Sequence, residues 1–156
     1  MTYLLLKYVH VIGACVLLGT GAGIAFFMVV GHATGKPATI AAIARIVVIA
    51  DMVFTATAVV VQPITGASLV WHLGWSLWDG WIAASIALYV LTGAFWLPVV
   101  WMQVRMRDLA EAAARSQSPL PARYFTLFRL WFACGFPAFG AVLAILWLML
   151  AKPRFG

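Results

Sequence analysis

The sequence predicts an all-α polytopic membrane protein, an antiparallel bundle of four transmembrane helices with both termini outside. Of its 156 residues, 65% are hydrophobic and only 9% are charged, whereas soluble proteins carry roughly 25% charged residues. Apolar runs recur along the whole chain, and about 20 such residues suffice to cross a hydrocarbon core of ~30 Å. Residues 1–156 are therefore expected to form a single transmembrane domain surrounded by the lipid bilayer.

The first span is expected over residues 3–30, and it ends before a turn at residues 35–37. Gly19 and Gly23 form a G-x-x-x-G pair, with further small residues nearby. Small residues at this density let another helix, or a flat ligand, approach the backbone closely. Helix packing and contact with a planar cofactor both remain open as the reason for these glycines.

The second span is expected over residues 42–72, after a short amphipathic lead-in. Several residues on it follow one another at spacings of three and four, which places them on one helix face; they are Asp51, Thr55, Ala58, Gln62, Thr65, Leu69 and His72. This face is polar at most positions. A proline inside a membrane helix is tolerated when neighbours satisfy the carbonyl that it frees, so Pro63 is expected to mark a kink beside a polar contact.

The third and fourth spans are expected over residues 81–104 and 125–151. Four tryptophans, at positions 71, 75, 78 and 81, mark one membrane face before the third span, because indoles gather at the headgroup level. The third span carries a second polar face formed by Ser85, Tyr89, Thr92, Trp96 and Gln103. It is expected to end in an amphipathic, solvated tail, which a proline-containing linker at residues 116–121 connects to the fourth span.

The basic residues predict the orientation of the bundle. Seven of the ten lie in or beside the first and third loops, namely Lys36, Arg45, Arg105, Arg107, Arg115, Arg123 and Arg129. The positive-inside rule places these loops in the cytoplasm, and the termini and the tryptophan-rich loop outside a bacterial inner membrane. Anionic headgroups and topology thus explain the formal charge of +6. Nucleic acid is not an expected partner, whereas a homo-oligomer and a larger membrane complex both stay open.

Two histidines could carry redox chemistry at the outer face. His10 lies inside the apolar first helix, one turn after Lys7, and His72 lies near the outer end of the second helix. His32 is about 33 Å from His10 along the first helix at 1.5 Å per residue. Imidazoles on facing helices can hold a b-type haem axially, so we expect His10 and His72 as haem-iron ligands and Lys7 beside a propionate. The alternative is that His10 only bonds to a neighbouring helix and that His72 is an interfacial residue.

Asp51 and Arg129 lie at comparable depths near the cytoplasmic ends of the second and fourth helices. A charge in hydrocarbon seeks an opposite charge or water, so the two residues are expected to form a buried ion pair. Two roles stay open for this pair: a structural clamp between helices, or part of a proton path. Cys15 and Cys134 are expected to be buried free thiols. The sequence contains no H-E-x-x-H, C-x-x-C or phosphate-binding loop motif, and it assigns no catalytic residue.

The first helix, with Lys7, His10 and Gly13, resembles that of the HemJ-type protoporphyrinogen oxidases and of the CopD-type membrane domains. Over nearly the whole chain, the sequence is more similar to a bacterial family of predicted integral membrane proteins of unknown function. That resemblance rests on Ala50-Asp51, Phe54-Thr55, Val61-Gln62-Pro63, Thr65-Gly66, Trp96 to Trp101, Trp131-Phe132, Gly135 and Pro137-Ala138-Phe139. The HemJ resemblance implies a haem ligand at His10. It also implies a lysine in the third helix, and this chain has no lysine between Gly80 and Gln103.

Three functions follow as expectations from these observations. The first is a small inner-membrane redox protein, and if it is an enzyme, a haem-dependent oxidoreductase. The second is a cofactor-free accessory or assembly subunit of a larger complex, whose polar residues only hold helices together. The third is a proton-coupled transporter of a small solute that uses Asp51.

Overall fold

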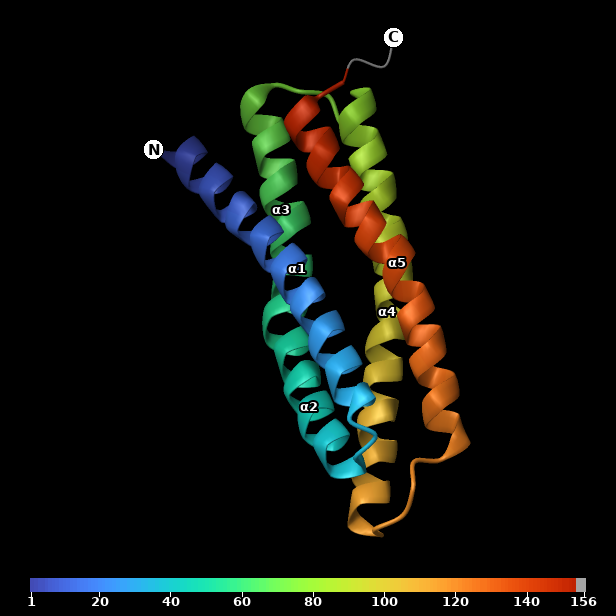
Figure 1. Ribbon diagram of the computed structural model, residues 1–156. Helices are drawn as coiled ribbons and strands as arrows, with labels where there is room; N and C mark the ends of the chain where they lie inside the picture. Colours follow the sequence, from blue (N-terminus) through green and yellow to red (C-terminus); the bar gives the residue numbers. More distant parts are fainter. Residues whose placement is uncertain (154–156) are drawn as a thin grey trace.

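The computed structural model describes residues 1–153 and confirms an all-helical membrane fold in that part of the chain. Four helical segments are long and apolar enough to cross a membrane. Their elements, shown in Figure 1, are α1 (Thr2–Ala33), α2 (Pro37–Ala50), the π-helix η1 (Asp51–Thr55), α3 (Ala56–Leu73), α4 (Gly80–Arg115) and α5 (Ala122–Ala151). α2, η1 and α3 follow one another without a break, so they form a single span. The beginning of α1 and the end of α5 lie at the same end of the bundle (Figure 1).

Local chemistry sets the helix boundaries. α1 and α3 are followed by Gly35 and Gly74, whose φ angles of +64° and +66° lie in the left-handed region that glycine adopts without steric cost. Pro37 begins α2 at the position where its missing N–H is not needed. Pro63, by contrast, lies inside α3. The expectation that this proline does not end the second span is confirmed.

The main hydrophobic core lies towards one end of the bundle, where α1, α2, α4 and α5 pack together. Met106, Ala110 and Tyr124 are fully buried there. α4 is about 54 Å long at 1.5 Å per residue, so its last turns extend beyond a ~30 Å hydrocarbon core. The expected tail is indeed amphipathic. Met106 and Ala110 lie on its buried face, whereas Arg105 is exposed and Arg107 is partly exposed.

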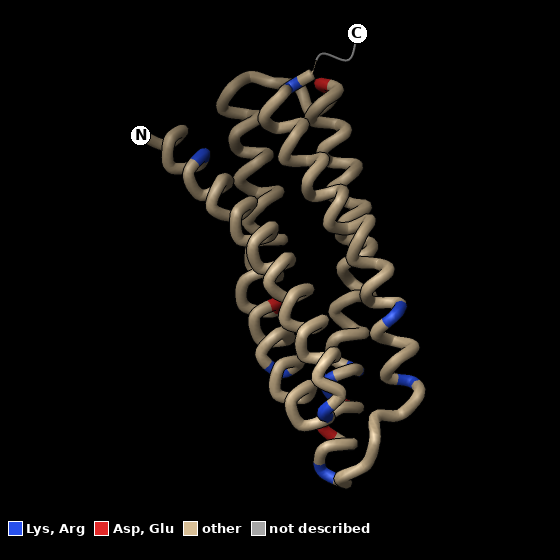
Figure 2. The backbone as a smooth tube through the Cα atoms, viewed as in Figure 1, with Lys and Arg blue, Asp and Glu red and all other residues tan. Residues whose placement is uncertain are grey.

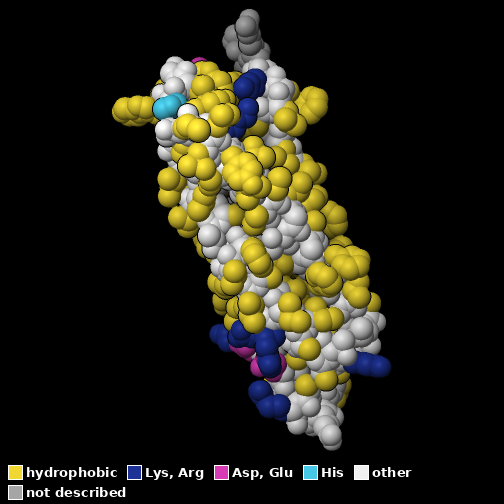
Figure 3. All heavy atoms as spheres, turned by 90° about the vertical axis from the view of Figure 1, so that its left-hand side faces the viewer, with side chains coloured by type: hydrophobic (Ala, Val, Ile, Leu, Met, Phe, Trp, Pro, Cys, Tyr) yellow, Lys and Arg dark blue, Asp and Glu magenta, His cyan; other side chains and the backbone are white. Residues whose placement is uncertain are grey.

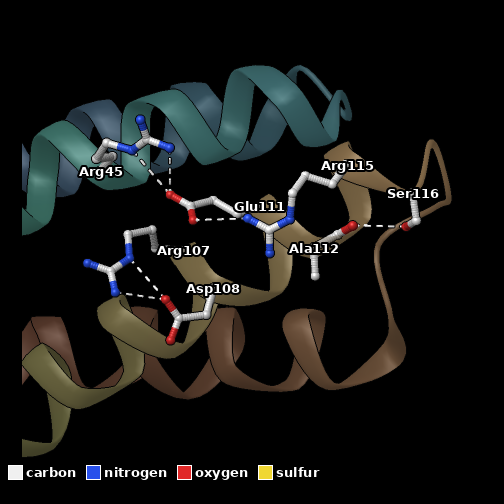
Figure 4. Close-up of polar contacts among 7 residues, drawn as sticks. All are labelled: Arg45, Arg107, Asp108, Glu111, Ala112, Arg115 and Ser116. Atoms are coloured by element: carbon white, nitrogen blue, oxygen red, sulfur yellow. Dashed lines mark hydrogen bonds and ion pairs between the residues drawn. The ribbon is translucent and has the colours of Figure 1, made fainter.

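Most charged residues gather at the end of the bundle that holds this core (Figure 2). Glu111 of α4 accepts two hydrogen bonds from Arg45 of α2, the shorter being 2.9 Å, and lies 3.8 Å from Arg115 (Figure 4). Arg107 pairs with its neighbour Asp108 at 2.7 Å. Such exposed pairs contribute only ~0–1 kcal/mol each. They therefore fix the α2–α4 register less than the buried core does.

Hydrophobic side chains cover much of the surface between the two ends (Figure 3). Cys15, expected to be buried, lies on the exposed surface of α1, and Cys134 is half-buried. At the opposite end of the bundle from Arg45 and Glu111, Lys152 Nζ lies 4.6 Å from the ring centroid of Trp75. This cation–π contact connects the end of α5 to the tryptophan-rich loop.

Candidate functional site

A cavity of about 500 Å³ lies at the centre of the bundle, lined by residues of α1, η1, α3, α4 and α5. Ala14, Gly21, Ala22 and Ala25 of α1 contribute its small-residue wall. This volume falls within the range of roughly 300–1,000 Å³ that is typical of small-molecule sites. The cavity thus gives the small residues of α1 a role besides contact with another helix.

Asp51 forms the polar wall of this cavity and begins the π-helix η1. In the π-turn the N–H of Ala56 donates to the carbonyl of Asp51, five residues earlier. Such π-bulges are frequent at functional sites, because the extra residue changes the direction of the side chains around it. Asp51 and Thr55 are both buried, at 2% and 7% exposure. A π-helix at this position was not expected from the sequence.

The carboxylate of Asp51 is held by neutral donors of α4. Trp96 Nε1 donates to Asp51 Oδ1 over 3.4 Å. Gln103, oriented so that its amide satisfies both neighbours, donates to Asp51 Oδ2 over 3.1 Å and accepts from Trp131 Nε1 over 3.2 Å. The contacts connect η1, α4 and α5 through one buried polar network. Such a network orders the carboxylate without supplying a positive charge.

Two buried side-chain oxygens beside the cavity are poorly satisfied within residues 1–153: Gln62 Oε1 has no hydrogen-bond partner, and the Thr55 hydroxyl has only the neighbouring Asp51 carboxylate. Both residues line the cavity wall. A buried oxygen without a partner costs about 1–3 kcal/mol, and native proteins rarely retain one without a reason. Both oxygens are fully buried, so they lie behind the mainly apolar surface of the cavity.

Pro63 interrupts the backbone hydrogen bonding of α3 next to the cavity, and a side chain of α4 supplies the missing donor. Because proline has no N–H, it leaves the carbonyl of Val59, four residues earlier, without its helical donor. The hydroxyl of Tyr89 donates to that carbonyl. Tyr89 also lines the cavity. The polar contact expected beside Pro63 is therefore present, and its partner is a tyrosine of the third span.

His10 packs directly against α3. Its Nδ1 lies 2.9 Å from Thr65 Oγ1, and its ring lies so close to Gly66 that an added Cβ would be 3.2 Å from His10 Cε1. One turn further along α1, the side chain of Gln62 occupies the space that a Cβ on Gly13 would take. Two glycines thus allow two polar side chains to join α1 and α3. The predicted interhelical bond of His10 is therefore present, and it is made through Nδ1.

The other expected haem residues lie elsewhere. His72 is exposed and is about 10 Å beyond Thr65 along α3, at 1.5 Å per residue. Lys7 is exposed, with Nζ 5.9 Å from the ring centroid of Tyr3 on its own helix. Haem ligation by His10 and His72 stays a prediction, because the bond to Thr65 involves only Nδ1, and a ligating histidine commonly uses its second ring nitrogen in this way. No cluster of three His, Cys, Asp or Glu side chains suited to a metal ion occurs in the described chain.

The structure does not bring Asp51 and Arg129 together. Arg129 is exposed on α5, and none of the ion pairs among residues 1–153 includes it or Asp51. Equal depth did not produce a pair because Arg129 faces outward and can reach the membrane surface. Asp51 instead faces Trp96 and Gln103. The predicted ion pair between Asp51 and Arg129 is therefore wrong, and neutral hydrogen-bond donors surround Asp51 instead.

The sequence indicated the two polar faces on the second and third spans but not how they meet. Trp96, Gln103 and Tyr89 were recognised as one face of α4, yet their partners on η1 and α3 were not assigned. Trp131 was not identified as a polar residue of the site. Its only signal was an indole in the middle of an apolar helix, which is more often packing than hydrogen bonding.

A family model described as "Predicted integral membrane protein (DUF2269)" matches residues 4–153. No curated protein and no solved structure matches the chain.

Proposed function

Since the chain belongs to the DUF2269 family of predicted integral membrane proteins, whose description carries no activity, we propose a function from the central cavity. The protein is a membrane-embedded binding protein for a small lipophilic amine. The apolar body of the ligand occupies the cavity, and its ammonium group faces Asp51. This proposal is closest to the expectation of a solute carrier that uses Asp51.

The observation that carries the proposal is the lack of a positive partner for Asp51. Its contacts are the neutral groups of Trp96 and Gln103, and the ion pairs of residues 1–153 do not include it. A carboxylate in a low-dielectric interior is stabilised by an opposite charge. A positively charged group that donates hydrogen bonds therefore complements the Asp51 side of this cavity.

The remaining wall suits an apolar or aromatic body. Phe132, Phe136, Phe139 and Trp96 line the cavity from α4 and α5. Aromatic faces attract a cation within ~6 Å of the ring centroid as well as apolar surface. An uncharged hydrocarbon would leave the charge of Asp51 without an opposite charge, and an anion would be repelled by it.

The experiment compares 1-naphthylmethylamine, a cation at neutral pH, with the neutral 1-naphthylmethanol. Binding to purified protein is measured by titration calorimetry in an uncharged detergent. We expect the amine to bind roughly 10- to 100-fold more tightly than the alcohol, the equivalent of about 1.5–3 kcal/mol for a charged hydrogen bond. Asp51→Asn should abolish this preference, and Asp79→Asn, the same change in the outer loop, should retain it. Equal binding of both probes to the wild-type protein would refute the proposal.

The same preparation tests the other functions. A Soret band that is lost in His10→Ala would support a haem protein with His10 as an iron ligand. A colourless, stable protein that binds neither probe would support a cofactor-free accessory role in an oligomer or a larger complex. We further propose that the membrane is a bacterial inner membrane and that the basic end of the bundle faces the cytoplasm, because basic residues concentrate there (Figure 2).

A further inference from the structure

A small niche separate from the central cavity lies at the basic end of the bundle, between α4 and the beginning of α5. Its volume is about 140 Å³, and it is lined by Arg105, Asp108, Leu109 and Arg123. We call these four residues the arginine niche. The linker at residues 116–121 reverses the chain, which places Arg123, the second residue of α5, opposite the last turns of α4. Two arginines distant in sequence therefore share one site.

The charge of the arginine niche is only partly balanced. Asp108 already accepts two hydrogen bonds from Arg107, at 3.0 and 2.7 Å. The ion pairs of residues 1–153 include neither Arg105 nor Arg123. Both guanidinium groups can therefore donate to an external anion.

The position of Arg105 relates the niche to the membrane surface. Its guanidinium carbon lies 5.9 Å from the ring centroid of Trp101, one turn earlier on α4. Tryptophan favours the level of the lipid headgroups. The first turn of α5, with its unpaired N–H groups, adds a partial positive charge beside Arg123. The niche thus lies where phosphates of the bilayer are concentrated.

From this geometry we infer that the arginine niche binds the phosphate group of an anionic phospholipid. Guanidinium groups match phosphate oxygens with paired hydrogen bonds. The carboxylate of Asp108 adds an acceptor for a headgroup hydroxyl, such as those of phosphatidylglycerol. The volume is below the usual range of sites for drug-sized molecules, so a single headgroup suits it. This inference is independent of the function proposed for the central cavity.

The test measures lipid retention by native mass spectrometry and thermal unfolding of the full chain in an uncharged detergent. Phosphatidylglycerol, phosphatidylcholine and inorganic phosphate are added separately. For the wild-type protein we expect one retained phosphatidylglycerol and a higher unfolding temperature, with little effect of phosphatidylcholine. The double variant Arg105→Gln/Arg123→Gln should lose the retained lipid and most of the temperature shift.

Arg129→Gln is the matched control, because it removes the same charge from an exposed arginine of α5 outside the niche. It should keep both responses. If the double variant unfolds during purification, Arg105→Lys/Arg123→Lys preserves the charge and should lower retention without abolishing it. An equal shift with inorganic phosphate would show that the phosphate comes from solution rather than from lipid. Equal retention of phosphatidylglycerol by the double variant and by Arg129→Gln would overturn the inference.

Discussion

Tyr89→Phe is expected to destabilise the bundle, and the cost should depend on Pro63. The Tyr89 hydroxyl donates to the Val59 carbonyl, which Pro63 leaves without a helical N–H. Removing the hydroxyl exposes a bare carbonyl to an environment without water. Interhelical hydrogen bonds in membranes average ~0.6 kcal/mol and reach ~1.7 kcal/mol. Because no other side chain of residues 1–153 donates to the Val59 carbonyl, we expect Tyr89→Phe to lower the free energy of unfolding by about 1–2 kcal/mol.

The double variant isolates this mechanism. In Pro63→Ala, residue 63 regains an N–H that can bond to Val59 in the ordinary helical pattern. The tyrosine hydroxyl then becomes dispensable, so Tyr89→Phe should cost less than about 0.5 kcal/mol in that background. The coupling energy between the two changes should be about 1 kcal/mol.

The assay is reversible unfolding in mixed micelles with increasing fractions of an anionic detergent, followed by far-UV circular dichroism. Tyr8→Phe is the control, because Tyr8 is 65% exposed on α1 and should change stability by less than about 0.5 kcal/mol. Additive free energies for Tyr89→Phe and Pro63→Ala would refute the assignment of Tyr89 as the replacement donor.

Three further predictions concern packing and topology. Gly13→Ala should destabilise by no more than about 1 kcal/mol, because the new methyl group displaces only the flexible end of the Gln62 side chain. Gly19→Ala, with no atom within 4 Å of its added Cβ, should be near neutral in the same unfolding assay. Arg129→Gln should cost less than about 0.5 kcal/mol, and its effect should add to that of Asp51→Asn; a large coupling in a double-mutant cycle would restore their predicted pair. In a variant without native cysteines, Ser118→Cys should react with an impermeant maleimide from the cytoplasmic side and Ser76→Cys from the outside, and the reverse pattern would contradict the predicted orientation.

The sequence alone determined the membrane class, the number of spans and the location of their polar faces. These features depend on local quantities: about 20 apolar residues cross a bilayer, and spacings of three and four place Asp51 with Gln62, or Tyr89 with Trp96, on one helix face. The placement of Pro63 inside a span likewise followed from its sequence context. Each could be predicted because it requires no knowledge of the neighbouring helix.

Only the tertiary structure decided which polar groups meet. The rotation of each helix about its axis is set by packing of its whole face, so equal depth along the membrane does not imply contact. Asp51 therefore faces Trp96 and Gln103 rather than Arg129, and His10 faces Thr65 rather than His72. The π-helix at Asp51–Thr55 rotates all later residues relative to α2. A π-helical turn of this kind changes which neighbouring side chains a helix face contacts, without changing the spacing of its hydrophobic residues.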